Sequence, residues 1–146
     1  MELSAELIDT ITSTRNASRK KDPTKPEEDK KTLDLRDSQI EGWGKFEVYA
    51  EKYKGFARWN LSQNYLTDVP ESFSAESQIK ELLLSENTLS SMLGFDGNIY
   101  LTLLDLSNNQ IKKIEGLTNL PELRVLVIHR ADDRNWQRTA SRESRT

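Results

Sequence analysis

Cysteine is absent from this sequence of 146 residues, and histidine occurs once. Without cysteine the chain can form neither a disulfide framework nor a thiolate metal site. No apolar run approaches the roughly 18 residues of a membrane-spanning helix. Carboxylates at Glu2, Glu6 and Asp9 interrupt the only apolar cluster near the start, unlike a secretory or mitochondrial leader. These absences predict an intracellular protein without a membrane segment.

Acidic and basic residues are unevenly distributed along the chain. The net charge of −3 combines a net −5 over residues 33–128 with a net +2 over residues 129–146, while residues 1–32 balance. A phosphate-binding surface has to be basic, so the acidic middle argues against a nucleic-acid partner. Residues 42–44 (Gly-Trp-Gly) lack the rest of any glycine-rich phosphate loop. The sequence therefore predicts no cofactor.

One apolar pattern recurs along the chain at a nearly fixed interval. Residues 101–114 read L-x-x-L-x-L-x-x-N-x-I-x-x-I, and the same frame fits two earlier segments well and two others in weaker form. The second apolar position of the pattern falls on residues separated by 26, 23, 22 and 22 positions, namely Leu33, Trp59, Leu82, Leu104 and Leu126. Self-similarity at such a period indicates a solenoid of stacked repeats.

The pattern resembles the leucine-rich-repeat family, and the resemblance covers residues 30–130. Residues 105–117 are most similar to the 22-residue subclass found in a regulatory subunit of protein phosphatase-1 and in many ciliary proteins. The resemblance implies an α/β solenoid with a short, curved parallel sheet whose concave face binds a protein partner. It further implies a phosphatase, cytoskeletal or ciliary partner, and a cytoplasmic location with nuclear or ciliary alternatives.

The order of residues within a repeat predicts its local structure. A period-two pair such as Leu104 and Leu106 is typical of a short strand that points alternate side chains inward. In three repeats the asparagine after the strand should hydrogen-bond to backbone groups of neighbouring turns, and these residues are Asn64, Asn87 and Asn109. In the longer first repeat, aromatic residues at helical spacing predict a convex-side helix over residues 45–53.

The N-terminal arm, residues 1–29, lies outside the repeat pattern. Leu3, Leu7, Ile8 and Ile11 would share one face of a short helix over residues 2–12. Three interpretations are open for this helix: a frayed terminus, a cap docked on the first repeat, or a partner-binding element. The remainder of the arm is rich in charge and proline and has little apolar surface to bury, so it predicts a disordered linker.

The repeat pattern decays at the C-terminus. Residues 131–146 are polar and predict a disordered tail after the solenoid of residues 30–130. A solenoid needs a terminal unit to cover its last core edge. Trp136 could fold over that edge. Alternatively, the chain is an N-terminal fragment or truncated form of a larger leucine-rich-repeat scaffold with no independent activity.

Non-core strand positions should face the concave surface, the binding side in the family. Two such positions are expected on each strand, in chain order Asp34 and Arg36, Arg58 and Asn60, Glu81 and Leu83, Leu103 and Asp105, and Val125 and Val127. The last strands bring apolar positions together, so the predicted partner site comprises Leu83, Leu103, Val125 and Val127, with Glu81 and Asp105 beside them. The alternative is that the tail, or a missing remainder of the chain, covers these side chains.

Catalysis finds little support in the sequence. His129 has no serine or carboxylate at a diagnostic spacing, so it is interpreted as a surface histidine. The carboxylates expected on the concave face are more typical of solubility and complementarity than of acid–base chemistry. The sequence predicts a non-enzymatic adaptor without a catalytic or metal site.

Overall fold

The computed structural model describes residues 1–18, 32–69, 78–95, 98–117 and 120–129 of the chain. Within these residues the chain forms two helices, α1 (Ala5–Ser18) and α2 (Phe46–Lys52). It also forms the five strands β1 (Thr32–Asp34), β2 (Arg58–Asn60), β3 (Glu81–Leu83), β4 (Leu103–Asp105) and β5 (Val125–Val127). None of the helices in the described part is long and apolar enough to span a bilayer.

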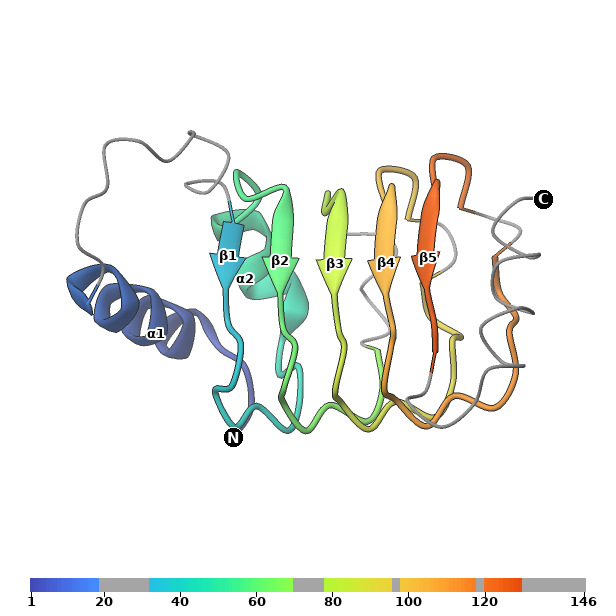
Figure 1. Cartoon of the computed structure of the whole chain (residues 1–146). Coiled ribbons are helices and arrows are strands. Elements are labelled where there is room, and N and C mark those ends of the chain that lie inside the picture. Colours follow the sequence, from blue (N-terminus) through green and yellow to red (C-terminus); the bar gives the residue numbers. More distant parts are fainter. Residues whose placement is uncertain (19–31, 70–77, 96–97, 118–119, 130–146) are drawn as a thin grey trace.

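The five strands form one parallel sheet in the order in which they occur along the chain (Figure 1). Each strand pairs with the next in the same register, so the middle residues of the strands stand side by side. The middle residue of every strand is buried, and these residues are Leu33, Trp59, Leu82, Leu104 and Leu126. The predicted repeat frame, which was aligned on these positions, is therefore confirmed.

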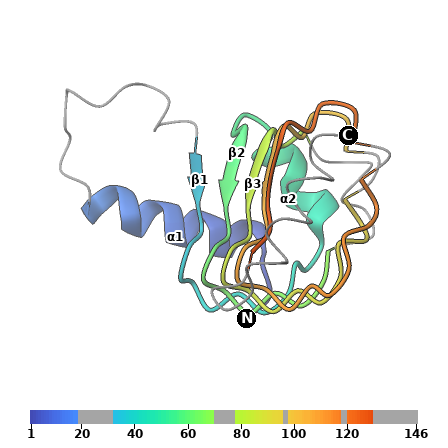
Figure 2. The same ribbon diagram turned by 45° about the vertical axis from the view of Figure 1, so that its right-hand side comes forward.

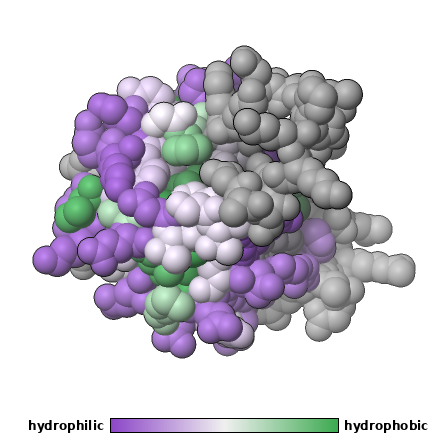
Figure 3. All heavy atoms as spheres, turned by 90° about the vertical axis from the view of Figure 1, so that its left-hand side faces the viewer, coloured by the Kyte–Doolittle hydropathy of each residue, from purple (hydrophilic) through white to green (hydrophobic). Residues whose placement is uncertain are grey.

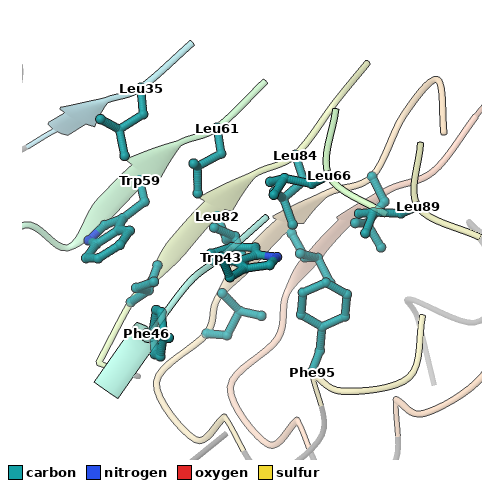
Figure 4. Packing of buried hydrophobic residues seen from close by; sticks show 14 of the residues in the cluster. Leu35, Trp43, Phe46, Trp59, Leu61, Leu66, Leu82, Leu84, Leu89 and Phe95 are labelled. Carbon is teal, nitrogen blue, oxygen red and sulfur yellow. The ribbon is translucent and has the colours of Figure 1, made fainter. Parts of the chain in front are cut away.

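The core lies behind the sheet and continues from repeat to repeat. Leucines directly after the strands, such as Leu35, Leu61 and Leu84, stack alongside one another in this layer (Figure 4). Behind β1 and β2, Phe46 of α2 packs against Trp59, with their ring centroids 6.1 Å apart. α2 occupies the convex side of the first repeat, as predicted over residues 45–53, and explains why that repeat is longer than the others.

The asparagine side chains hold successive turns together. The Oδ1 atom of Asn64 accepts hydrogen bonds from the backbone N–H groups of Ser38 and Ile40, at 3.1 and 3.0 Å. Its Nδ2 donates to the carbonyl oxygens of Leu35 and Leu61, at 3.0 and 2.9 Å. One and two turns further on, Asn87 and Asn109 also donate to two such carbonyl oxygens, and the Oδ1 of each accepts from one backbone N–H, that of Leu66 or Leu89. The predicted asparagine ladder is confirmed, and it satisfies backbone groups that burial would otherwise leave unpaired.

A left-handed backbone residue follows the strand in each of the first four repeats. The φ angles at these positions lie between 47° and 58°, and the residues are Asp37, Gln63, Glu86 and Asn108. None of them is glycine, although residues with a Cβ atom are strained in this region by roughly 1–2 kcal/mol. The left-handed conformation is maintained because residues next to the turn hydrogen-bond to the asparagine ladder, as Ser38 and Ile40 do with Asn64. The strain is therefore a cost of stacking the repeats.

Residues 1–18 of the N-terminal arm dock on the open side of β1 (Figure 2). The Leu3 N–H donates to the Gly42 carbonyl and the Glu41 N–H donates to the Met1 carbonyl, both at 2.8 Å. Leu3 and Ile8 are fully buried against the first repeat. Of the three interpretations of this segment, the structure has the docked cap. The helix runs over Ala5–Ser18, so the prediction of residues 2–12 was too short, because polar residues after Ile11 concealed its second half.

α1 links the two sides of the first repeat. At its first turns, Asp9 forms an ion pair with Lys52 of α2 at 2.7 Å and accepts a hydrogen bond from the Tyr53 hydroxyl. Near its end, the Arg15 guanidinium reaches Asp34 of β1, with Nη1 and Oδ1 2.7 Å apart. Figure 3 shows that hydrophilic side chains predominate among the described residues at this end of the molecule. This end therefore has the polar surface that a terminal solenoid unit requires.

Arg15 also replaces part of the asparagine ladder. The first repeat has Ser38 where the next three repeats have asparagine, and a hydroxyl group offers fewer donors than an amide. In the second repeat, Nδ2 of Asn64 donates to the carbonyl two residues before it, at 3.2 Å. In the first repeat that carbonyl belongs to Arg36, and it accepts from both the Ser38 hydroxyl, at 2.9 Å, and the Arg15 guanidinium. The cap thus adds a second donor to this carbonyl.

The first residues of the predicted disordered linker are helical. The linker was predicted to follow residue 12, and residues 13–18 belong instead to α1. Residues 19–31 and 130–146, including Trp136, lie outside the described residues, so their predicted disorder stays a prediction.

Candidate functional site

The outer face of the sheet is the face turned away from the core and α2, and it corresponds to the predicted concave face. Because the middle residue of each strand points into the core, the residues on either side of it point outward. The register aligns these residues in two rows across the strands. The first row comprises Thr32, Arg58, Glu81, Leu103 and Val125, and the second comprises Asp34, Asn60, Leu83, Asp105 and Val127.

The assignment of Arg36 to the outer rows was wrong. β1 ends at Asp34 and contributes Thr32 and Asp34 to the rows, whereas Arg36 follows the strand. The first repeat is a weak copy of the pattern, and the prediction placed its two outward positions at Asp34 and Arg36 instead of Thr32 and Asp34. The outer positions of the other four strands lie where they were predicted.

The outer face over β1 to β3 carries charges that neutralise one another. Asp34 contacts Arg15 at 2.7 Å and Arg36 at 2.9 Å. Partial burial alone would raise the pKa of Asp34, but the hydrogen bonds from Arg36 and the charge of Arg15 outweigh it and lower that pKa below its usual value. On the next two strands, Arg58 and Glu81 pair at 3.3 Å. This half of the face is polar and its charges are matched.

The outer face over β3 to β5 is mainly apolar. Val125 is 45% exposed, and Leu83, Leu103 and Val127 are half-buried. Leu103 stands beside Val125, and these two residues extend the first row beyond Glu81. The register therefore brings all six residues of the predicted partner site onto one continuous surface, and these are Leu83, Leu103, Val125, Val127, Glu81 and Asp105.

Asp105 is the acidic residue inside this apolar area. It lies between Leu83 and Val127 in the second row and two residues after Leu103 on β4. Its Oδ1 atom accepts from the backbone N–H of Ser107 at 3.0 Å and from the Ser107 hydroxyl at 2.7 Å. Among the residues that the structure describes, no Lys or Arg side chain forms an ion pair with Asp105.

The described residues offer no grouping typical of catalysis or metal binding. His129 is half-buried at the end of the β5 segment, and its carbonyl oxygen accepts a hydrogen bond from the Asn108 N–H at 2.8 Å. Over the described ranges, no three His, Cys, Asp or Glu side chains gather in a way that could hold a metal ion.

Two features were not found by reasoning from the sequence. One is the contact of Arg15 with Asp34 and Arg36, which joins residues about 20 positions apart with no motif between them. The other is an open hollow of about 520 Å³ where the N-terminal segment meets α2, lined by residues that include Leu3, Lys45 and Val48. Neither had a signal in the sequence, because both depend on how the N-terminal arm docks.

The parallel sheet, the regular register and the asparagine ladder define a leucine-rich-repeat solenoid. Residues 101–135 match the family model described as leucine-rich repeats, two copies. A solved structure of an internalin C2 from Listeria monocytogenes is similar, with a TM-score of 0.51 and 18% sequence identity. The similar region covers 65% of this chain and 50% of the internalin chain, so it spans about half of the length of that protein. No curated protein matches the chain.

These comparisons support a leucine-rich-repeat assignment and, at that identity, the likeness to the internalin concerns the fold alone. The fold presents a regular sheet face whose side chains differ from strand to strand. Proteins of this fold generally act as interaction modules, and the fold by itself does not specify a partner.

Proposed function

We propose that the chain is a non-enzymatic interaction module and that its outer face over β3 to β5 binds a protein partner. The observation that carries the proposal is the continuous area formed by Leu83, Leu103, Val125 and Val127 beside the charge-matched half of the same face. An apolar area with a polar border is typical of a protein-binding surface. Glu81 and Asp105 supply polar contacts within it.

The rigidity of the sheet favours binding at this face. Each contact side chain stands on a strand whose middle residue is buried and whose neighbours are hydrogen-bonded in register. A surface held in this way loses little conformational entropy when a partner binds, so more of the contact energy appears as affinity. The short β-strand side chains Val125 and Val127 are also stiff, because branching at Cβ restricts their rotamers.

A pair of photo-crosslinking variants tests the proposal. Benzoylphenylalanine replaces either Val125 on the outer face or Val48 on α2, two valines that are 45% and 61% exposed. In cells that express the whole chain, we expect a discrete crosslinked protein from position 125 and none of the same mass from position 48. The Val125→Asp substitution should abolish co-purification of that protein, whereas Val48→Asp should not. Equal crosslinking at both positions, or binding that survives Val125→Asp, would contradict the proposal.

We further propose membership of the 22-residue subclass, with a phosphatase, cytoskeletal or ciliary partner and a cytoplasmic, nuclear or ciliary location. The support is the spacing of 22 to 23 residues between the buried centres Trp59, Leu82, Leu104 and Leu126. The crosslinked partner, identified by mass spectrometry, tests the partner class directly. Fluorescence of a tagged whole chain in ciliated cells tests the location, and a secreted or membrane-lumen signal would exclude it.

A further inference from the structure

The acidic residues of the outer face differ in how their charge is matched. Asp34 has two guanidinium groups within 2.9 Å, and Glu81 has the guanidinium of Arg58 at 3.3 Å. Asp105 has hydrogen bonds from Ser107 alone, and both go to Oδ1. Within the described part of the chain its Oδ2 atom receives no hydrogen bond and no cation. Asp105 is thus an outer-face carboxylate whose charge this part of the chain does not match.

Apolar side chains surround Asp105, so its charge affects any partner that binds there. In the second row it is flanked by Leu83 and Val127, and Leu103 stands two positions earlier on its own strand. Adjacent strands lie about 4.8 Å apart, so a partner that covers these three side chains also covers Asp105. Removing an ionised carboxylate from water without a matching charge costs several kcal/mol. A partner that contacts the apolar area therefore has to compensate that carboxylate.

We infer that the partner anchors on this face through a lysine or arginine side chain set among apolar side chains, with Asp105 as the acceptor. The inference rests on the proposed function of the outer face. The two hydrogen bonds from Ser107 to Oδ1 fix the orientation of the carboxylate. They leave Oδ2 as the oxygen that accepts the incoming N–H group. A hydroxyl or an amide can donate a hydrogen bond to the carboxylate, but only a lysine or arginine also supplies the opposite charge that offsets its desolvation, which favours a basic residue.

The first stage of the test selects defined peptides on the whole chain. A displayed library of random 16-residue peptides is panned on residues 1–146 after depletion on the Val125→Gln variant, a neutral change, so that binders which ignore the outer face are removed without selecting against basic peptides. The expected binders contain a lysine or arginine within three positions of two or more aliphatic or aromatic residues. Two binders are then synthesised, each with a partner peptide in which the basic residue is replaced by glutamine.

The second stage measures the coupling between that basic residue and Asp105. The variant is Asp105→Asn, which keeps an oxygen that can accept from Ser107. Asn60 on β2 has the same role, because its Oδ1 accepts from the Ser62 N–H at 3.1 Å. The matched control is Asp68→Asn, the same change at an exposed residue outside the outer face. Replacing the basic residue by glutamine should weaken binding about tenfold or more to the original chain and to Asp68→Asn, but less than about twofold to Asp105→Asn.

The outcomes separate the inference from the proposed function. Binders that depend on Val125 but lack a basic residue, or a charge preference that persists in Asp105→Asn, would overturn the inference and leave the outer face as a binding surface. The absence of any binder that depends on Val125 would overturn both. A loss of charge preference in Asp68→Asn would show a general effect of net charge, and it too would overturn the role of Asp105.

Discussion

At the scale of single residues, the buried strand centres carry most of the packing. Leu104 lies in the middle of β4 between Leu82 and Leu126 and is fully buried. We expect Leu104→Ala to lower the free energy of unfolding by about 2–5 kcal/mol, because it removes buried methyl groups and leaves a cavity. Urea melts of the two proteins measure the change. Val125→Ala, on the outer face of the next strand, is the control and should cost less than about 1 kcal/mol. A larger loss in Val125→Ala than in Leu104→Ala would mean that the two faces were assigned the wrong way round.

A second prediction at this scale concerns the left-handed turn residues. Gln63 has a φ of 58° and an exposed side chain, so its Cβ atom adds strain without useful contact. We expect Gln63→Gly to raise the free energy of unfolding by roughly 1 kcal/mol, because glycine adopts this region without the steric penalty. Asn108→Gly is the control and should gain less, since asparagine tolerates positive φ. A loss of stability in Gln63→Gly would show that entropy of the unfolded chain outweighs the strain.

Features that recur in every repeat could be predicted from the sequence, whereas contacts between distant segments could not. The buried centres and the asparagines recur at a fixed interval, so each copy confirms the others, and the outer positions of β2 to β5 follow by alternation. The first repeat lacks that support, because Ser38 replaces its asparagine and its outward residues were read as Asp34 and Arg36. The pairing of charges across the outer face was not predictable, since Arg15 reaches Asp34 from a separate helix.

At the scale of elements, α1 takes the place of a preceding repeat. Its Ile8 covers the core together with Leu3, which precedes the helix, and its Arg15 supplies a donor to the first turn. The same side chain holds Asp34, which lies at the edge strand of the sheet. Capping in this protein is therefore electrostatic as well as apolar, and its electrostatic part should respond to pH.

The pH dependence has a defined sign. Contacts with Arg36 and Arg15 lower the pKa of Asp34 in the folded state below its usual value of 3.8, despite the opposing effect of burial. A lowered carboxylate pKa stabilises the fold above the unfolded value, and that stability is lost as the pH falls through the folded value. At pH 7, Asp34→Asn should cost roughly 1–3 kcal/mol, as expected for hydrogen bonds to a charged group. Urea melts at several pH values should show this cost shrinking below about pH 4. A cost independent of pH would contradict the assignment.

At the scale of the whole molecule, the sheet joins repeats that each contact only their neighbours. Stability in such a solenoid is approximately a sum of repeat and interface contributions, so loss of a terminal unit acts first on the repeat next to it. Here that unit is α1, and the repeats next to it contain Trp43 and Trp59. Tryptophan fluorescence therefore reports on the capped end of the molecule, whereas far-UV circular dichroism reports on all repeats.

Removal of the cap should make the fluorescence and dichroism signals differ. In a Trp136→Phe background, which restricts fluorescence to Trp43 and Trp59, urea melts of the whole chain should give the same midpoint by fluorescence and by circular dichroism. Deleting residues 1–18 removes the burial of Leu3 and Ile8 and the donor from Arg15. The fluorescence midpoint should then fall below the dichroism midpoint, because the first repeats unfold before the later ones. Arg15→Gln alone should shift the fluorescence midpoint in the same direction by a smaller amount. If both midpoints fall together after the deletion, the repeats are coupled strongly enough to unfold as one unit, and the nearest-neighbour description of this solenoid fails.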